Sequence, residues 1–523
     1  MENILTLQNI LEFSAKSDPN KEAIFDGYKR ISYQQLLDDV ECLAAALTQL
    51  NIRKGDRVMV SLPNWHEFVT IYFSLAKIGA ILVPCNTRYQ VNEISYILEN
   101  SRAKAVFLID NDKNINVFEQ YVNKSVENEF EHIFTVRFTK EGNLSFEDLL
   151  ELGKNKVAQN VLINPKEDVF SILYTSGTTG DPKGAMLTHH NVFSTAQISN
   201  IALDCNKNDV FLVAVPAFHV FGMVPSILSA IAVGGRIVFM EEFKAGKALQ
   251  IIEQEKITIH HGVPTMFILE LNHPTFDDVD LSSLKTGIIA AAPCPEEIVK
   301  KIRMKMGCNI VVSYGLTETS ATLTVTGLDD DDRLRSETIG KPVPGAEVKI
   351  VDANREEVAS GEVGEIACRS NGVFIGYYNM PEKTSEAIDN DGWFYTGDLG
   401  TKDKQGYFRV VGRKKDLIIR GGYNIYPREI EELFYKHPSV LEVAIVGLPD
   451  TVLGEVACAA IKLKPNKVET EKAMRQFIEE RVADFKVPDR FVFLDELPMT
   501  PSGKIKKIAL QEILRAKLQY SLR

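Results

Sequence analysis

The sequence predicts a large α/β domain followed by a smaller α+β domain. Three observations support this prediction. Fully apolar runs alternate with helix-like segments in the first part of the chain, shorter strand-like runs begin near Val343, and a basic, Gly-containing stretch after Gly412 precedes a last unit of roughly a hundred residues. The length of 523 residues also fits about three structural units.

The first part is predicted to be α/β because strands covered by helices on both faces are apolar throughout rather than alternating. Helical candidates such as Asn191–Asn200 and Pro295–Met306 lie between the apolar runs, so we expect two α/β subdomains here. The runs are AVFLI (105–109), FSILY (170–174), VFLVAV (210–215), RIVFM (236–240), GIIAA (287–291) and NIVVSY (309–314).

The later part of the chain has a different character. The runs AEVKIV, VGEIAC and GYFRVVG are short and separated by turn residues, which predicts a small β-rich subdomain within the large domain. The last unit predicts an α+β domain, in the order helix 427–436, strand 441–447, strand 456–463, helix at about 470–482 and strand 490–494.

Composition limits the partners and the compartment. A net charge of −12 disfavours nucleic acid, so any phosphate site must be built locally. The seven cysteines are scattered without a CxxC pair, which argues against disulfides and a structural zinc site. The apolar stretch Val220–Gly235 is shorter than the ~20 residues of a spanning helix and is predicted to be a buried helix. We expect a soluble, cytoplasmic protein; a homodimer stays open.

Residues 174–184, YTSGTTGDPKG, directly follow an apolar strand. Backbone N–H groups and hydroxyls of such a loop can donate to phosphate oxygens, and Lys183 adds a positive charge. The pattern GxxxxGK[ST] does not fit, so this is not a Walker A loop. A flexible Ser/Thr/Gly turn is an equally good interpretation of the loop taken alone.

The complete string closely resembles the phosphate-loop signature of the adenylate-forming superfamily, in particular its acyl-CoA synthetase and fatty-acid–CoA ligase branch. Further segments resemble the other signatures of that family, in the family's order and over essentially the whole chain. They are VPAFH (215–219), AAAP (290–293), YGLTE (314–318), YTGD (395–398), RKKDLIIRGGYN (413–424) and PSGK (501–504).

The resemblance implies an ATP-dependent acid–thiol ligase. In that reaction a carboxylate attacks the α-phosphorus of ATP, pyrophosphate leaves, and the acyl group passes from the acyl-adenylate to coenzyme A with release of AMP. Two anions approach each other, so catalysis consists mostly of positioning and charge neutralisation. The implied cofactors and co-substrates are ATP, Mg²⁺ and coenzyme A.

The resemblance also implies roles for single residues. Glu318 would bind Mg²⁺ as a hard oxygen ligand, Tyr314 would stack on the purine, and Asp398 would accept the ribose hydroxyls. The implied catalytic residues are Lys504, Glu318, Thr317, Thr175 and His219. The implied nucleotide-binding residues are Thr175, Ser176, Gly177, Thr178, Thr179, Gly180, Lys183, Ala291, Ala292, Pro293, Tyr314, Gly315, Thr317, Asp398, Arg413 and Lys504.

A mobile C-terminal domain is a further implication of the resemblance. The large domain would span residues 1–412, the hinge residues 413–416 with Lys415 at the pivot, and the small domain residues 417–523. Lys504 would bridge the acid and the α-phosphate during adenylation. After rotation, Gly421, Gly422 and Tyr423 would line the thiol channel.

The acid is predicted from the segment 217–219, Ala-Phe-His, where amino-acid-activating relatives usually carry Asp. No acidic residue stands there, which disfavours an amino acid because its buried ammonium would lack a partner. A medium- or long-chain fatty acid is our first expectation and an aryl or cinnamate-like acid the second; loading of a carrier protein stays an alternative. The implied acyl pocket contains His219, Val220, Phe221, Gly222, Met223, Val263 and Pro264, although several of these could be plain core residues.

Overall fold

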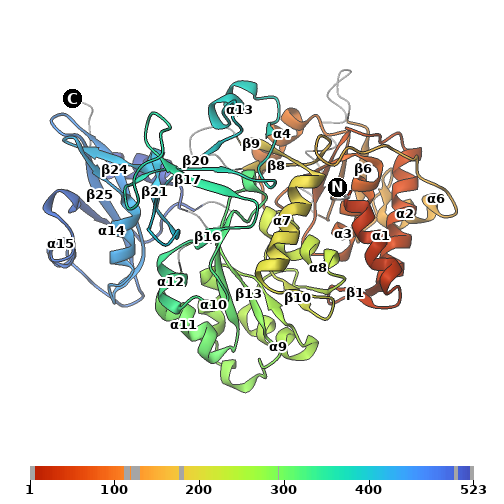
Figure 1. Ribbon diagram of the computed structural model, residues 1–523, viewed down its shortest axis with the longest axis horizontal. Helices are drawn as coiled ribbons and strands as arrows, with labels where there is room; N and C mark the ends of the chain where they lie inside the picture. Colours follow the sequence, from red (N-terminus) through yellow and green to blue (C-terminus); the bar gives the residue numbers. More distant parts are fainter. Residues whose placement is uncertain are drawn as a thin grey trace. The chain divides into compact units, whose positions relative to one another are not determined.

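The computed structural model of the protein describes residues 6–110, 118, 130–175, 182–292, 294–499 and 505–518. These residues form two compact units. The first contains the described parts of Met1–Thr175, Pro182–Glu347 and Cys368–Phe394, and the second contains those of Val348–Ala367 and Tyr395–Arg523. Each unit is described by itself, with the elements labelled in Figure 1.

One sheet of the first unit carries the predicted phosphate loop. Its inner strands are parallel, and β8, β9 and β19 add antiparallel pairs at one edge. In the described residues the strand order is β19 (Gly376–Tyr377), β9 (Lys183–Thr188), β8 (Val169–Thr175), β4 (Ile81–Pro84), β3 (Arg57–Ser61), β5 (Ala105–Leu108), β6 (His132–Thr135) and β7 (Leu144–Ser145).

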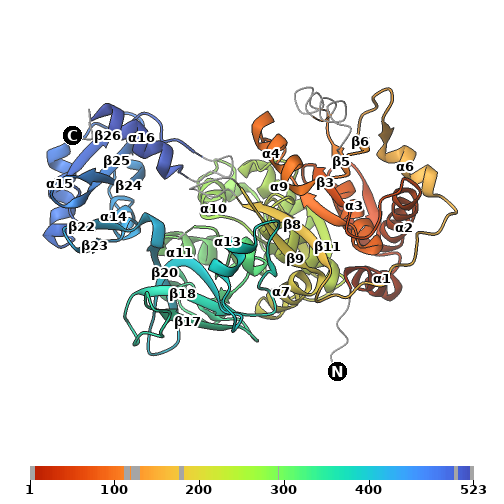
Figure 2. The ribbon, with the colours of Figure 1, turned by 90° about the horizontal axis from the view of Figure 1, so that it is seen from above.

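Helices cover this sheet, as its apolar strands require. Figure 2 shows α3 lying beside β3 and β5, with α2 next to it. α7 begins where Thr188 caps it: the Thr188 side chain accepts from the Asn191 N–H at 3.1 Å, and the Asn191 side chain accepts from the Thr188 N–H at 2.9 Å. The helices are α2 (Tyr33–Gln49), α3 (His66–Ile78), α4 (Val91–Ser101), α6 (Phe146–Gly153) and α7 (His189–Ala202).

The second sheet of this unit is parallel at its centre and antiparallel at both ends. Within the described ranges its order is β16 (Lys341–Pro342), β15 (Thr324–Val325), β14 (Asn309–Tyr314), β13 (Thr286–Ile289), β12 (Ile259–His260), β10 (Val210–Val213), β11 (Arg236–Phe239), β1 (Glu22–Phe25) and β2 (Arg30–Ser32).

An apolar cluster joins this second sheet to the helices α9, α10 and α11, which lie beside it in Figure 1. Other helical elements complete the unit. The elements are α1 (Leu7–Ser17), η1 (Gly222–Leu228), α8 (Ser229–Ala232), α9 (Ala245–Glu255), α10 (Pro264–Leu271), η2 (Phe276–Asp278), α11 (Glu296–Lys305), η3 (Thr317–Thr319), α12 (Asp332–Glu337) and α13 (Pro381–Ala387).

The second unit holds two smaller sheets. One has the order β17 (Glu347–Val351), β18 (Gly364–Arg369), β20 (Phe394–Lys402) and β21 (Phe408–Arg413). Glu347 at the start of β17, Cys368 and Arg369 at the end of β18, and Phe394 at the start of β20 belong to the first unit. The other contains β23 (Tyr423–Ile425), β22 (Ile418–Arg420), β25 (Gly454–Leu463), β24 (Val440–Asp450) and β26 (Arg490–Phe493). Its helical elements are η4 (Lys414–Asp416), α14 (Pro427–Phe434), α15 (Glu471–Glu479), η5 (Asp484–Lys486) and α16 (Lys507–Lys517).

The α/β prediction is confirmed, with local corrections. Two predicted strands end two residues early, β10 at Val213 and β13 at Ile289, and β5 and β11 end one residue early. The stretch Val220–Gly235 is largely buried as expected, but its longest element is the π-helix η1 rather than a regular helix. Pro225 lies inside η1, and a proline has no N–H for the regular helical bond. The two units divide the chain differently from the expected boundary at residue 412, and the hinge at 413–416 stays a prediction.

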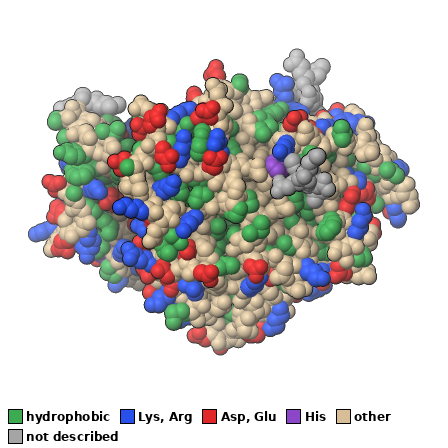
Figure 3. Space-filling model, viewed as in Figure 1, with side chains coloured by type: hydrophobic (Ala, Val, Ile, Leu, Met, Phe, Trp, Pro, Cys, Tyr) green, Lys and Arg blue, Asp and Glu red, His purple; other side chains and the backbone are tan. Residues whose placement is uncertain are grey.

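The surface agrees with a locally built phosphate site. Figure 3 shows basic and acidic side chains interspersed over the face in view, so charge of one sign does not dominate that face. Among the described helices, none is long and apolar enough to cross a bilayer.

Candidate active site

The β8–β9 hairpin brings together both ends of the predicted phosphate loop. Thr175 is the last residue of β8 and pairs directly with Lys183, the first residue of β9. The Thr175 hydroxyl donates to the Lys183 carbonyl at 3.3 Å. Lys183 Nζ lies 4.9 Å from the centre of the Tyr377 ring. The other predicted loop residues, Ser176, Gly177, Thr178, Thr179 and Gly180, lie outside the described residues.

The YGLTE segment turns sharply where β14 ends at Tyr314. A Cβ added to Gly315 would lie 1.8 Å from the Ala321 carbonyl oxygen, so only glycine fits there. The chain then forms η3, which includes Thr317, and the Leu316 N–H donates to Thr319 Oγ1 at 2.9 Å. This turn packs against β9, the strand that begins with Lys183.

Glu318 is buried in this turn, with 8% of its surface exposed. The Tyr377 hydroxyl donates to Glu318 Oε1 at 2.9 Å, and the Phe374 N–H donates to the Glu318 carbonyl at 2.8 Å. Burial, reinforced by the Glu318 carboxylate, raises the pKa of Tyr377 far above its ordinary value, so the phenol keeps its proton and acts as a donor.

The Glu318 carboxylate is suited to a hard divalent cation. Within the described part of the chain, the Tyr377 hydroxyl donates to Oε1 of this carboxylate, which leaves Oε2 available to a metal. Carboxylate oxygens are the protein ligands that Mg²⁺ prefers. When bound, such an ion would neutralise phosphate charge during the transfer. The residues present therefore fit Mg²⁺.

The adenine-side segment begins where β13 ends. Ala291 has φ +70°, in the left-handed region that non-glycine residues rarely adopt and that is enriched at functional sites. Ala291 and Ala292 are exposed. Pro293 lies outside the described residues.

The predicted acyl residues belong to one apolar region at the end of β10. Val220 and Met223 are buried, and Phe221 and Val263 are partly buried against the cluster of the second sheet. Pro264 starts α10. Gly222 has a packing role, because a Cβ there would lie 2.2 Å from the Pro216 carbonyl oxygen. His219 is exposed, which excludes its interpretation as a buried core histidine.

His261 connects this apolar region to the sheet. Its Nδ1 accepts from the Ile288 N–H at 2.9 Å, and its Nε2 donates to the Pro225 carbonyl at 3.1 Å. Burial lowers the pKa of His261 to about 3, so the ring is neutral. The ring centre lies 6.0 Å from that of Phe221.

Two polar residues of this unit were missed by the sequence interpretation. Asn64 is buried, its Nδ2 lies 3.0–3.1 Å from the carbonyls of Val213, Val215 and Met240, and its Oδ1 accepts from the Ala217 N–H at 2.7 Å. The other is Tyr377. Neither belongs to a local motif, and the available signal was only a polar residue in an apolar stretch, as in Leu62-Pro-Asn64.

The predicted ribose residues lie in the second unit, on neighbouring strands. Asp398 of β20 is directly opposite Arg413 of β21, and Arg413 Nε lies 3.2 Å from Asp398 Oδ1. Asp398 is 5% exposed. Beside them, Lys414 Nζ lies 2.8 Å from Glu365 Oε2, and the Gly397 N–H donates to Glu365 Oε1 at 3.0 Å.

The predicted hinge and thiol-channel residues are exposed parts of the same unit. Lys415 lies in η4. Gly421 and Gly422, with φ +56° and +86°, form the two-residue turn between β22 and β23, a conformation that requires positive φ at both positions. The exposed Tyr423 ring stacks on Phe485 with centres 4.8 Å apart. Lys504 lies outside the described residues.

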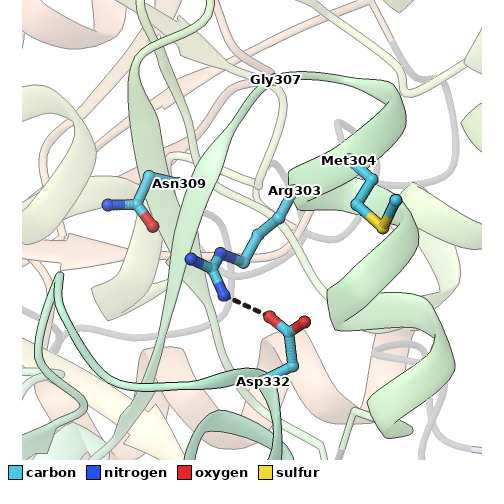
Figure 4. Close-up of a pocket in the computed structure, with 5 residues that line it drawn as sticks. All are labelled: Arg303, Met304, Gly307, Asn309 and Asp332. Atoms are coloured by element: carbon cyan, nitrogen blue, oxygen red, sulfur yellow. Dashed lines mark hydrogen bonds and ion pairs between the residues drawn. The ribbon is translucent and has the colours of Figure 1, made fainter.

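Two other polar clusters do not match the predicted site. One is a pocket of about 390 Å³ that includes Asn309 at the start of β14. Figure 4 shows its Arg303 side chain reaching toward Asp332. Ligands of parallel sheets bind at the opposite, carboxyl ends of strands.

The second cluster is Asp26, His66 and Glu67, whose possible ligand atoms lie within 4.8 Å of one another. Arg137 already pairs with both carboxylates, with Nε 2.8 Å from Glu67 Oε1. The cluster is therefore an ion-pair network completed by the chain's own cation.

Comparison with known sequences agrees with this geometry. Residues 11–378 match the family described as AMP-binding enzyme, and residues 429–504 match the AMP-binding enzyme C-terminal domain. The chain is 39% identical to the putative acyl-CoA synthetase YngI of Bacillus subtilis, over 97% of this chain and 96% of the relative. It is 33% identical to the mitochondrial medium-chain acyl-CoA ligase ACSF2 of Homo sapiens, over 98% and 88%.

Solved structures give the same result. The anthranilate CoA ligase AuaEII in complex with anthranoyl-AMP has a TM-score of 0.89 and 28% identity, covering 99% of both chains. ATP-bound MatB from Rhodopseudomonas palustris has a TM-score of 0.87 and 28% identity, covering 97% of this chain and 99% of that one. The chain therefore belongs to the AMP-binding enzyme family and is an AMP-forming acid–CoA ligase that uses ATP, Mg²⁺ and coenzyme A.

Proposed function

We propose that the acid activated by this ligase is a medium-chain fatty acid. The composition of the acyl region supports this most directly: residues 214–223 and 263–268 contain no Asp, Glu, Lys or Arg. A second carboxylate or an ammonium group on the acid would be buried there without a partner, which is costly. The buried Val220 and Met223 instead suit an uncharged hydrocarbon chain.

The relatives support the same class. ACSF2 is named as a medium-chain ligase, at 33% identity over nearly the whole chain. Burial of one methylene contributes about 0.8 kcal/mol, a factor of about four in affinity. If the pocket ends just beyond the last carbon of a medium-chain acid, its affinity should therefore differ clearly between acids of neighbouring chain lengths.

The test is pyrophosphate release and acyl-CoA formation with butanoate, octanoate and hexadecanoate, each with and without coenzyme A. We expect the highest kcat/KM with octanoate, and acyl-CoA only when coenzyme A is present. A higher kcat/KM with hexadecanoate or butanoate would contradict the chain-length proposal.

An aryl acid is the second candidate. The Phe221 and His261 rings, with centres 6.0 Å apart and an angle of 35° between them, could pack against an aromatic substrate. The structural similarity to an anthranilate CoA ligase points the same way. Benzoate and cinnamate belong in the same acid panel, and a higher kcat/KM with either than with octanoate would favour this candidate.

The residue roles are also proposals, supported by the seven motifs and the geometry of the hairpin and turn. Glu318 would bind Mg²⁺, and Thr175, Lys183 and Thr317 would contact the phosphates. Asp398 and Arg413 would bind the ribose. Lys504 would contact the acid and the α-phosphate, with rotation at Lys415 and a thiol channel at Gly421–Tyr423.

A cytoplasmic location and a homodimer complete the proposal. All seven cysteines, which lie in the described residues, are free thiols, as is usual in a reducing compartment. Light scattering after size-exclusion chromatography would measure the oligomeric state, and a monomer mass would contradict the dimer.

A further inference from the structure

We propose that Tyr377 is a positioning residue for adenylation: its hydroxyl fixes the Glu318 carboxylate in the orientation that binds the metal ion, and its ring restrains the Lys183 ammonium. This inference rests on the proposed role of Glu318 as the metal ligand. Tyr377 itself contacts neither the metal nor the reacting atoms, and acts through these two side chains.

Strand β19 places Tyr377 next to the phosphate-loop hairpin. Tyr377 pairs with Ala185 and Gly376 with Met186 of β9, and the Tyr378 N–H donates to the Gly184 carbonyl at 2.8 Å. Lys183 stands two residues before Ala185 on that strand, and its Nζ lies 4.9 Å from the Tyr377 ring centre. A cation over an aromatic face is attracted by the ring. The ring therefore restrains the lysine.

The segment 372–377 holds Glu318 at two points. The Phe374 N–H binds the Glu318 carbonyl at 2.8 Å, and the Tyr377 hydroxyl binds its carboxylate at 2.9 Å. The Phe374 and Tyr377 rings contact each other edge to face, with centres 4.8 Å apart. Ser320, at the end of the turn, donates to the Gly372 carbonyl at 2.8 Å. Main chain and carboxylate are thus fixed by one segment.

The backbone of β19 is itself fixed by α13. Gly376 has φ +140°, and a Cβ there would lie 2.7 Å from Thr384 Cγ2, so glycine is required. The Tyr377 N–H donates to Thr384 Oγ1 at 2.9 Å. The position of the phenol is therefore determined by the fold before any nucleotide binds.

A neutral donor is the group that this position needs. A Lys or Arg in contact with Glu318 would neutralise the carboxylate and compete with the metal ion. A phenol orients Oε1 by one hydrogen bond and leaves the negative charge in place. Partners of this kind orient metal ligands, and their loss typically weakens metal binding by about 10- to 100-fold.

The test compares Tyr377→Phe, which removes only the hydroxyl, with Tyr378→Phe as the matched control. Tyr378 is the next residue, and its ring packs on the apolar cluster around β8 instead. Mn²⁺ binding to each protein with the non-reacting analogue α,β-methylene-ATP is measured by electron paramagnetic resonance. The Mg²⁺ dependence of pyrophosphate release, the KM for octanoate and Tm are measured alongside.

We expect Tyr377→Phe to bind Mn²⁺ about tenfold more weakly and to need correspondingly more Mg²⁺, with the KM for octanoate within about twofold. Tyr378→Phe should match the wild type. Unchanged Mn²⁺ binding by Tyr377→Phe would overturn the proposal. So would a loss of metal affinity accompanied by an equal rise in the octanoate KM and a fall in Tm, which would make Tyr377 a general stabiliser.

Glu318→Gln in the same titration separates this inference from the site assignment. If Glu318→Gln binds Mn²⁺ as the wild type does, the metal-ligand role itself is wrong. If Glu318→Gln loses the metal and Tyr377→Phe does not, only the positioning role fails.

Discussion

Two carboxylates with proposed ligand-binding roles, one in each unit, are buried to similar extents but held in different ways. Glu318 in the first unit is 8% exposed and Asp398 in the second is 5% exposed. Glu318 accepts a hydrogen bond from the neutral Tyr377 phenol, and Lys183 Nζ lies over the ring of the same tyrosine. Asp398 is paired with a guanidinium at 3.2 Å.

The difference matches the ligand that each carboxylate is proposed to bind. A metal ion needs a carboxylate whose charge is not already neutralised, which a phenol allows and an arginine would not. Ribose hydroxyls are neutral donors, so Asp398 can keep an arginine partner and still accept them. The partner of a buried carboxylate is therefore informative about its ligand.

The largest expected effect comes from Lys504→Ala. Adenylate formation should fall by about 10³-fold, because the cation that brings the two anions together is lost. Thioester formation from preformed acyl-adenylate should persist. Single-turnover assays of each half-reaction measure this, with Lys506→Ala as the control; equal loss in both halves would contradict the role.

Glu318→Gln should have the second-largest effect and lower kcat/KM for Mg-ATP by about 10²-fold, because the amide keeps the shape of the carboxylate and loses its charge. Pyrophosphate release as a function of Mg²⁺ measures it. Glu296→Gln on the surface of α11 serves as the control. Activity close to that of the wild type at low Mg²⁺ would remove the contrast between the two carboxylates.

Asp398→Ala should lower kcat/KM for ATP by about twentyfold, since hydrogen bonds to a charged group contribute about 1.5–3 kcal/mol. The wild type should also prefer ATP to its 2′- and 3′-deoxy analogues, and the variant should discriminate less. If the variant keeps the full preference, Asp398 does not bind the ribose.

Lowering the pH should destabilise the first unit, because the unit contains buried histidines. Burial lowers the pKa of His261 to about 3 and that of His189 to about 4, from 6.5. Below about pH 6.5 these histidines bind protons in the unfolded chain but not in the folded chain. The free energy of unfolding is therefore unaffected by them above that pH and decreases as the pH falls toward their folded-state pKa values. Each histidine contributes a loss of about 1.4 kcal/mol per pH unit in that window.

His189→Leu should reduce this pH dependence, because leucine does not titrate. The substitution should be tolerated, because neither ring nitrogen of His189 has a hydrogen-bond partner among the described residues. Thermal unfolding between about pH 7 and pH 5 measures the effect. His437→Gln in the second unit is the control. An unchanged slope in His189→Leu would show that another group is responsible.

Arg413→Met should have the smallest effect, a change of about fivefold or less in the KM for ATP, because its side chain is 44% exposed and exposed ion pairs contribute about 1 kcal/mol or less. Arg409→Met on the same strand is the control. A loss as large as that of Asp398→Ala would mean that the pair, rather than the carboxylate alone, binds the ribose.

Much of the fold could be predicted because its strands have a strong local signal. Runs such as NIVVSY are apolar throughout, and β14 occupies the same six residues. The π-helix η1 could not be predicted, because an apolar run gives no periodicity that would distinguish helix types. The final helix α16 was not assigned either.

Candidate site residues could be named from the sequence where they form contiguous motifs, and not where the contacts join distant parts of the chain. Thr175, Lys183 and Glu318 stand in recognisable strings. Tyr377 makes a hydrogen bond with a residue 59 positions away, and Asn64 with one 153 positions away. A short window of the sequence does not reveal such contacts.

Asn64 has a consequence for how the acid can enter. It follows β3 of one sheet and binds the backbone at the ends of β10 and β11 of the other, so it closes the seam between the two sheets next to the acyl residues. Opening that seam would expose several buried carbonyls together. Separation of the two sheets at this point as a way for the acid to enter is therefore disfavoured.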